Sequence, residues 1–470
     1  MDQSPYTPLH NLKGSILGKL KTYLATTQAT KNIHTLSITF EAINLVQLLP
    51  FIDHSQKILF CDREGSKQYL GIKFLRSFTS SFSISQAKQL IKENPKLIAL
   101  GGQRFHQNTK PAPEWVEIGN QFYTISQFTF STNFKETTLH INIDNEYFEN
   151  ATLASKLILD LDSLLSFKGH SQKSSQLTLE EEIPNKTQWF DQVNKAKAAF
   201  DNGSLEKVVL SRKSIFKSPS ALKPDDLFES MKLKVGENFI FHMQWRRDRS
   251  FTSMTPERLF KLEDSQIFSD AIAGTRPRGK DRDTDESLAN ELKSSTKELN
   301  EHRFVSKSVL ATLKSLGCLN AKIDGDPEQV LKLKHVQHLY TKLSGHIPGL
   351  KNISDLIEAF HPTPAVGGTP KQAALDWLVE NESYDRGLYA SPVGVITANG
   401  ADFCVAIRSA LVFENKLHVF AGAGIVAESD ANQEWDETTS KMKNFTLAFN
   451  DKDHDLKSRK ETIDEQHSSH

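Results

Sequence analysis

Short runs of apolar and β-branched residues, separated by turn residues, fill the first third of the chain and predict β-strands. These runs are HTLSITFEA, KILFCD, YLGIKFL, LIALGG, FYTISQFTF and TTLHINI. Several of them are followed by turn residues or by helical patterns. We therefore expect this part of the chain to be an α/β scaffold.

A polar stretch with little apolar periodicity, FKGHSQKSSQLTLEEEIPNK at 167–186, predicts a surface connection. After it, TQWFDQVNKAKAAFDNG predicts a helix with Gly203 as its stop, and LEKVVLSRKSIF is typical of a strand. The last stretch has few large apolar side chains and predicts a frayed tail. The expected organisation is an N-terminal α/β scaffold region at 1–185, a second compact region at 186–450 and a disordered tail at 451–470.

The composition favours a soluble globular protein, with 38% hydrophobic and 24% charged residues. A formal net charge of -1 provides no long-range field to favour nucleic acid or an anionic membrane. No stretch approaches the ~20 apolar residues that cross a bilayer. The three cysteines are far apart and lack CxxC spacing, which argues against zinc and disulfides and fits the cytoplasm. We expect no nucleic-acid or membrane partner and infer no obligatory protein partner.

The final helical pattern places Glu434, Glu437 and Lys441 on one face, behind Ser429 or Asp430 as the cap. Taken alone, this stripe is typical of a solvated face that carries a Glu-to-Lys pair.

A second long helical pattern, DESLANELKSSTKELNEHRFVSKSVLATLKSLG, carries Glu298 and Glu301 three residues apart. Two carboxylate pairs on two helices can share a cation. Magnesium prefers oxygen ligands and often uses only one or two carboxylates together with an anionic substrate, so this set suits magnesium better than zinc.

The segment FAGAGIVAESD predicts a strand that enters a glycine-rich turn before the final helix. Gly422 and Gly424 would let backbone N–H groups approach a carboxylate or a phosphate, although a plain strand-to-helix turn explains them equally well. Upstream, ADFCVAIRSALVF alternates, so Arg408 shares a strand face with Cys404 and Ala406. An arginine there is either exposed or salt-bridged, or it forms a two-pronged clamp on a carboxylate.

Lys207 lies in KVVLSR, on the same strand face as Val209 and Ser211. It is either a charged residue that protects a sheet edge or, if buried, a general base. Glu257 lies in SMTPERLF, after a proline and before another expected strand. A lysine base and a glutamic acid donor on opposite faces of one substrate would suit the exchange of a hydroxyl group for water.

Ten sequence blocks in order give the stretch from about Trp189 to Phe449 a resemblance to the chorismate-utilising enzymes. They are KVVLSR, TPERLF, AIAGTRPRG, KELNEH, VQHLYTKLSG, HPTPAVGGTP, DRGLYASPVG, VAIRSA, AGAGIV and EWDETTSKMKN. The family includes isochorismate, salicylate, anthranilate and aminodeoxychorismate synthases. The resemblance implies an α/β (α+β) fold of two stacked, mainly antiparallel sheets with outer helices, to which residues before 167 can also belong. It makes 186–450 the chorismate-binding catalytic region.

The resemblance also assigns roles to residues. It implies that Glu301 and Glu437 bind Mg²⁺ directly, that Glu298 and Glu434 hold its waters, and that the metal binds the ring carboxylate of chorismate. It further implies that the enolpyruvyl carboxylate is held by Arg408, Tyr389 and the backbone from Gly422 to Gly424. Lys441 and the Gly274-Thr275 loop would complete the pocket, and His338 would line the ring.

The nucleophile separates the members of this family. The anthranilate branch typically lacks the lysine in the KVVLSR block, which isochorismate and salicylate synthases use to activate water. By the resemblance, Lys207 takes a proton from water that attacks C2, and Glu257 protonates the departing C4 hydroxyl. HPTPAVGG and the W-x-E-T-x-x-K ending resemble isochorismate synthases more closely, whereas Thr369 departs from the phenylalanine that many of them have.

The implied activity is that of an isochorismate synthase, an isomerase of menaquinone or siderophore biosynthesis with chorismate as its small-molecule substrate. Salicylate synthase is the alternative, and so is an anthranilate or aminodeoxychorismate synthase component, because aminodeoxychorismate synthases can also carry the lysine. A binding protein that merely keeps the pocket is disfavoured by the presence of both Lys207 and Glu257.

Overall fold

The computed structural model describes residues 7–167, 176–231, 235–236, 238–333, 336–349 and 352–450. The expected tail at 451–470 lies outside the described residues, as does the stretch 168–175 of the expected connection. No helix of the described ranges is long and apolar enough to cross a membrane.

All six apolar runs of the first third form strands, as predicted: β1 (Ile33–Glu41), β2 (Lys57–Cys61), β3 (Gln68–Phe78), β4 (Ala99–Gln103), β5 (Gln121–Thr132) and β6 (Glu136–Asp144). The helices of this part are α1 (Thr7–Thr26), α2 (Leu45–Leu48), α3 (Ser83–Glu93), α4 (Glu146–Glu149) and α5 (Ala151–Leu164). Side chains of α1 and α5 pack on a core cluster that includes Phe128 and Ile141. This buries one face of the N-terminal strands.

The rest of the described chain has thirteen strands and seven helices. The strands are β7 (Thr178–Ile183), β8 (Lys207–Lys217), β9 (Phe239–Arg246), β10 (Arg249–Thr255), β11 (Arg258–Glu263), β12 (Gln266–Pro277), β13 (Leu319–Lys332), β14 (Val336–His346), β15 (Gly368–Thr369), β16 (Pro392–Thr397), β17 (Gly400–Val405), β18 (Ser409–Phe413) and β19 (Lys416–Ile425). The helices are α6 (Lys186–Asp201), α7 (Pro224–Ser230), α8 (Arg282–Ser294), α9 (Thr296–Ser315), α10 (Ile353–Phe360), α11 (Lys371–Asn381) and α12 (Ala431–Asn450).

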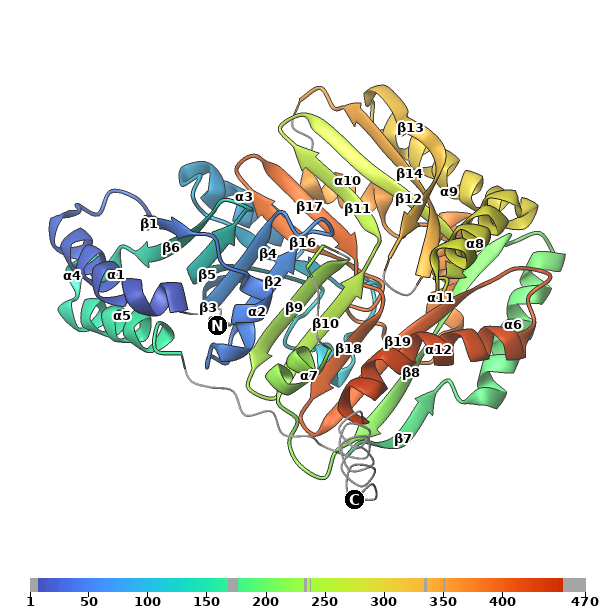
Figure 1. Ribbon diagram of the computed structural model, residues 1–470, viewed down its shortest axis with the longest axis horizontal. Helices are drawn as coiled ribbons and strands as arrows, with labels where there is room; N and C mark the ends of the chain where they lie inside the picture. The colour runs from blue at the N-terminus through green and yellow to red at the C-terminus, as the bar shows by residue number, and fades with distance from the viewer. Residues whose placement is uncertain are drawn as a thin grey trace, which may run out of the picture.

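The strands pair antiparallel and form one continuous network, with helices on its outside (Figure 1). The α/β fold class with mainly antiparallel sheets is therefore confirmed. Strand β2 pairs with β9 and strand β4 with β16, so backbone bonds join residues before 167 to residues after 186. The largest core cluster likewise combines Phe60 and Trp115 with Phe241 and Phe403.

Part of the expected connection is a strand. Residues 178–183 form β7, which pairs with the edge of β8 although its side chains are mostly exposed. Cross-strand ion pairs stabilise it in place of apolar contacts, since Glu182 binds Arg212 at 2.8 Å and Glu180 binds Lys416 at 2.6 Å. A periodicity search for apolar residues misses such a strand.

The long helical pattern at 285–317 is not one helix. It is interrupted at Ser295, whose side chain accepts the backbone N–H of Glu298 and so begins α9. The new helix start places Glu298 and Glu301 in its first two turns, next to the strand β12 on which α9 packs (Figure 1).

Two further expectations about the backbone were wrong. Gly422 and Gly424 do not form a turn but lie inside β19, and the turn follows Ile425. The strand expected through Arg408 breaks, because β17 ends at Val405 and β18 begins at Ser409. Arg408 lies between them with a left-handed φ of 49°. Alternation therefore does not set the direction of its side chain.

Gly387 provides a test of this packing. Its φ is 56°, and a Cβ added to it would lie 1.9 Å from the ring of the fully buried Trp115. We expect Gly387→Ala to lower the free energy of unfolding by about 2–5 kcal/mol, combining overpacking with a left-handed alanine. The control is Gly203→Ala, where φ is 75° but nothing lies within 4 Å, so only about 1 kcal/mol is expected. Equal losses in denaturant unfolding would contradict the packing argument.

Candidate active site

Lys207 is the first residue of β8, and its amine donates to Glu301 Oε1 of α9 at 3.0 Å. The side chain crosses the neighbouring strand at Gly424, where an added Cβ would lie 3.0 Å from Lys207 Cε. The glycine thus leaves space for the lysine. This explains one of the two glycines that the sequence suggested as part of an anion-binding turn.

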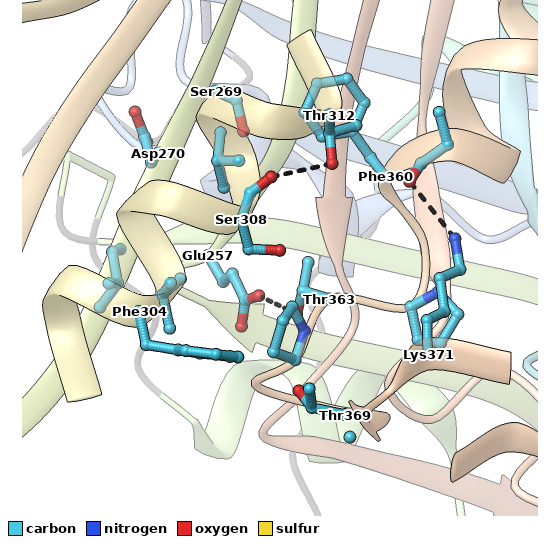
Figure 2. Close-up of a pocket in the computed structure, with 17 residues that line it drawn as sticks. Glu257, Ser269, Asp270, Phe304, Ser308, Thr312, Phe360, Thr363, Thr369 and Lys371 are labelled. Carbon is cyan, nitrogen blue, oxygen red and sulfur yellow. Dashed lines mark hydrogen bonds between the residues drawn. The ribbon is translucent and has the colours of Figure 1, made fainter. Parts of the chain in front are cut away.

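Glu257 lies between β10 and β11 and is buried. The Thr363 hydroxyl donates to its Oε1 at 2.9 Å (Figure 2). Burial raises the pKa of Glu257 to about 7, against the lowering effects of the Thr363 bond and the Lys207 charge. Near neutral pH, a large share of this carboxyl therefore carries the proton that a general acid must donate.

A cavity of about 130 Å³ lies beside Glu257, between α9 and the loop that carries Thr363 (Figure 2). Its walls include Phe304 and Ser308 of α9 and also Thr369. Small-molecule pockets usually measure ~300–1,000 Å³, so this space is better suited to water than to a ring-sized ligand.

Arg408 of the expected site is partly buried. Burial lowers the pKa of Arg408, and within the described part of the chain no Asp or Glu forms an ion pair with it. Its Nη2 lies 3.5 Å from Nε2 of His338, whose other ring nitrogen lies 3.0 Å from the Thr275 hydroxyl. Burial and the nearby positive charges lower the pKa of His338 to about 4, so the ring is neutral at neutral pH.

Gly274, in the same strand as Thr275, has a φ of 74° and interrupts the regular pairing of β12 with β14. Its carbonyl oxygen is 3.3 Å from His338 Nδ1. An added Cβ would lie 2.9 Å from Glu298 Oε2. The expected Gly274-Thr275 element therefore contacts both the histidine and one of the expected metal-site carboxylates.

The Tyr389 hydroxyl occupies the space where Gly422 lacks a side chain, 2.7 Å from the position of an added Cβ. Its ring stacks on Phe420 with centroids 5.6 Å apart. Lys441 of α12 donates to the Gly422 carbonyl at 2.9 Å. Tyrosine, glycine and lysine thus meet over one short part of β19.

The four expected metal-site carboxylates each have a partner within the chain. Glu301 binds Lys207, Glu298 binds Arg276 at 2.9 Å, and Glu437 binds Lys441 at 2.7 Å. Glu434 accepts a hydrogen bond from Ser429 at 3.0 Å.

Burial raises the pKa of Glu434, and the Glu437 charge adds to that effect. Among the described residues, no three His, Cys, Asp or Glu side chains form a group that could hold a metal. The donors nevertheless fit magnesium by type, since all four are carboxylates.

These contacts connect the expected site residues. Lys207 reaches Gly424 and Glu301, and its charge acts on Glu257. Lys441 reaches Gly422, and its charge acts on His338. The sequence did not identify Thr363 and Arg276 as site residues, although both lie in the sequence blocks that carry the resemblance. Their positions in the sequence do not indicate that Thr363 contacts Glu257 or that Arg276 contacts Glu298.

Comparison with known proteins identifies the family of this chain. The family model described as chorismate binding enzyme matches residues 24–450. The chain is 32% identical to isochorismate synthase MenF of Haemophilus influenzae, over 76% of this chain and 84% of that protein. It is 31% identical to the chloroplastic isochorismate synthase of Catharanthus roseus over 77% of this chain, and it spans only 64% of that relative's length.

Two solved structures share the fold. The menaquinone-specific isochorismate synthase MenF of Escherichia coli matches with a TM-score of 0.80 at 24% identity, over 92% of this chain and 99% of the other. Anthranilate synthase component I of Streptococcus pneumoniae matches with a TM-score of 0.64 at 19% identity, over 89% and 93%. At these identities, the structures show the fold alone. Because the family model spans almost all described residues, the chain belongs to the chorismate-binding enzyme family.

Proposed function

We propose that this protein is an isochorismate synthase, which converts chorismate to isochorismate. The observation that carries the proposal is a lysine and a protonatable carboxyl that act on one site: Lys207 lies close enough to Glu257 to lower its pKa, while burial keeps that pKa near 7. The names of the similar relatives support the same reaction.

The chain's own groups would bind a dianionic acid. Arg408 is a partly buried cation without a carboxylate partner in the described part of the chain, and it would bind the enolpyruvyl carboxylate in a charge-assisted pair. Tyr389, fixed against Phe420, would hold the same group. His338 is neutral and would line the ring without adding charge.

The reaction then exchanges two oxygens on the ring. Lys207 takes a proton from the water that attacks C2, and Glu257 gives a proton to the hydroxyl that leaves C4 as water. One water enters and one leaves, so the net reaction is an isomerisation. Afterwards Lys207 must lose a proton and Glu257 must regain one.

Magnesium would be held by Glu301 and Glu437, with Glu298 and Glu434 around its waters. When bound, it would supply positive charge to neutralise the ring carboxylate. Because Glu301 pairs with Lys207 here, metal binding to this carboxylate would release the lysine amine for its role as base.

Salicylate synthase is the alternative, since it makes the same intermediate and then eliminates pyruvate. Tyr389 favours isochorismate synthase over salicylate synthase, because its ring is stacked on Phe420 and its hydroxyl occupies the space over Gly422. A side chain so fixed would hold the enolpyruvyl group away from the geometry that pyruvate loss requires.

The product assay tests the proposal directly. With chorismate and Mg²⁺, we expect isochorismate to accumulate in reversible balance with chorismate, with little salicylate. Lys207→Ala should slow this conversion by roughly 10²–10⁴-fold because water loses its base, while chorismate binding persists. Stoichiometric pyruvate would assign a salicylate synthase instead, and an aminated product with ammonia would assign the anthranilate branch.

The pH profile tests the acid. Glu257 must be protonated to donate, and its pKa is about 7, so we expect kcat to fall as the pH rises through about 7. Glu257→Gln should remove this descending limb and lower kcat by roughly 10²–10⁴-fold. The measurement is kcat against pH in the wild type and the variant. A descending limb centred near 4.5, the ordinary value for glutamate, would be inconsistent with a buried acid.

Metal removal tests the carboxylates. Exhaustive chelation should abolish activity, and added Mg²⁺ should restore it, because the substrate's two carboxylates otherwise face four glutamates. Glu437→Gln should weaken the response to Mg²⁺ with little loss of thermal stability, since its ion pair with Lys441 is half-exposed. Full activity of the chelated enzyme would refute the proposal.

A further inference from the structure

An ion pair of the described residues is buried in the protein interior. Arg386 and Glu382 have side chains that are 0% and 3% exposed. The guanidinium binds both carboxylate oxygens, with Nε at 2.7 Å from Oε2 and Nη2 at 2.6 Å from Oε1. Although burial opposes ionisation, Arg386 holds the pKa of the Glu382 carboxyl below its usual range. The pair is therefore ionised in the interior.

The same guanidinium also binds two backbone carbonyls from separate segments. It donates to Val209 O at 2.7 Å and to Val366 O at 2.8 Å. Val209 is two residues from Lys207 on β8, and Val366 is three residues from Thr363, the partner of Glu257. One side chain thus connects the strand of the base to the loop that holds the acid (Figure 2 shows the Thr363–Glu257 bond).

The backbone hydrogen bonds between strand β8 and the loop that carries Thr363 cover only a short length. Strand β15 pairs with β8 through Gly368 and Thr369, and Val209 N–H donates to Gly367 O at 2.9 Å. Arg386 adds bonds from a third segment. It lies two residues after Tyr384, whose hydroxyl contacts Ser211, and three residues before Tyr389. By binding both Val209 O and Val366 O, Arg386 fixes the distance between strand β8 and the loop that carries Thr363.

A buried ion pair is by itself weak evidence of stabilisation, because apolar residues of similar volume often replace such a pair without loss. They cannot replace donors that hold two carbonyls at fixed positions. We propose that Arg386, charged and oriented by Glu382, is a positioning residue that sets Lys207 and Glu257 at the separation the reaction needs. This rests on the proposed function, whose two catalytic groups it positions.

The test is the double variant Glu382→Met/Arg386→Met, which removes both charges and keeps the volume. In the wild type, the Ser211 hydroxyl donates to Glu382 at 2.7 Å. In the double variant it loses this acceptor but keeps its hydrogen-bond partner Tyr384, whose hydroxyl is also 2.7 Å away. We expect a lower thermal stability, because the Val209 and Val366 carbonyls lose their donor. At temperatures where the variant is folded, we expect a KM for chorismate within about threefold but a kcat lower by about a hundredfold, since small misplacements of catalytic groups cost that much. The descending pH limb should move to higher pH, because the loosened Thr363 bond lowers the Glu257 pKa less.

The matched control is Glu114→Met/Lys213→Met. Lys213 lies on the same strand β8, six residues after Lys207, and its amine is 2.9 Å from Glu114 of the short turn Pro113–Trp115; the two side chains are 7% and 11% exposed. Removal of this pair should leave kcat and the pH profile unchanged. Arg386→Lys is the second test: it keeps the charge on Glu382, but an ammonium lacks the planar fork that reaches both carbonyls, so a similar loss of kcat is expected.

The outcomes separate the two proposals. A wild type that makes no isochorismate overturns the proposed function before any variant is compared. An active wild type together with an equally active Arg386→Lys or double variant overturns the positioning role alone. An equal loss of kcat in the control pair would also overturn it, because the effect would then belong to any buried charge on β8. If the double variant does not fold, the Arg386→Lys kinetics decide.

Discussion

The pairing of β8 with β19 is the constraint on which the rest of the site depends. It runs from Lys217 and Lys416 to Val208 and Ile425, and it places Gly422 and Gly424 beside the strand that begins with Lys207. Because neither glycine has a side chain, the tyrosine hydroxyl and the lysine stem can occupy the sheet surface. A larger residue at position 422 would displace the tyrosine hydroxyl, and one at position 424 would displace the lysine stem.

Charge balance is the second organising feature. The site region contains four expected metal-site carboxylates and the buried acid Glu257. Three of the four carboxylates each form an ion pair with a basic side chain. Arg408 is different, since it is partly buried without an acidic partner in the described ranges. A cation that is costly to bury and lacks a partner favours binding of an anion from outside.

The sequence predicted strands and helices well where periodicity or caps are local. Six apolar runs became strands, and α6 starts at its Asn185 cap and ends just before Gly203. The sequence-based prediction was wrong where contacts with distant segments determine the backbone. Examples are the break at Ser295, the irregular backbone at Arg408 and the charged strand β7.

The candidate site follows the same division. Ordered blocks indicated Lys207 and Glu257, because residue type and family resemblance suffice for that. They could not indicate that Thr363 contacts Glu257, 106 positions away in the chain, or that Arg386 would reach Val209, 177 positions away. Contacts at such separations are set by the register of the sheet, which no local pattern contains.

The same register affects how the protein is made. Strand β8 is synthesised before β19, its partner at Lys416 to Ile425, so during translation one of its edges remains without that partner until the intervening chain and β19 have left the ribosome. Exposed strand edges promote association between nascent chains, and long-range pairings form slowly. Expression at high rates or high temperature is therefore expected to lose this protein to aggregation before β19 can close the sheet.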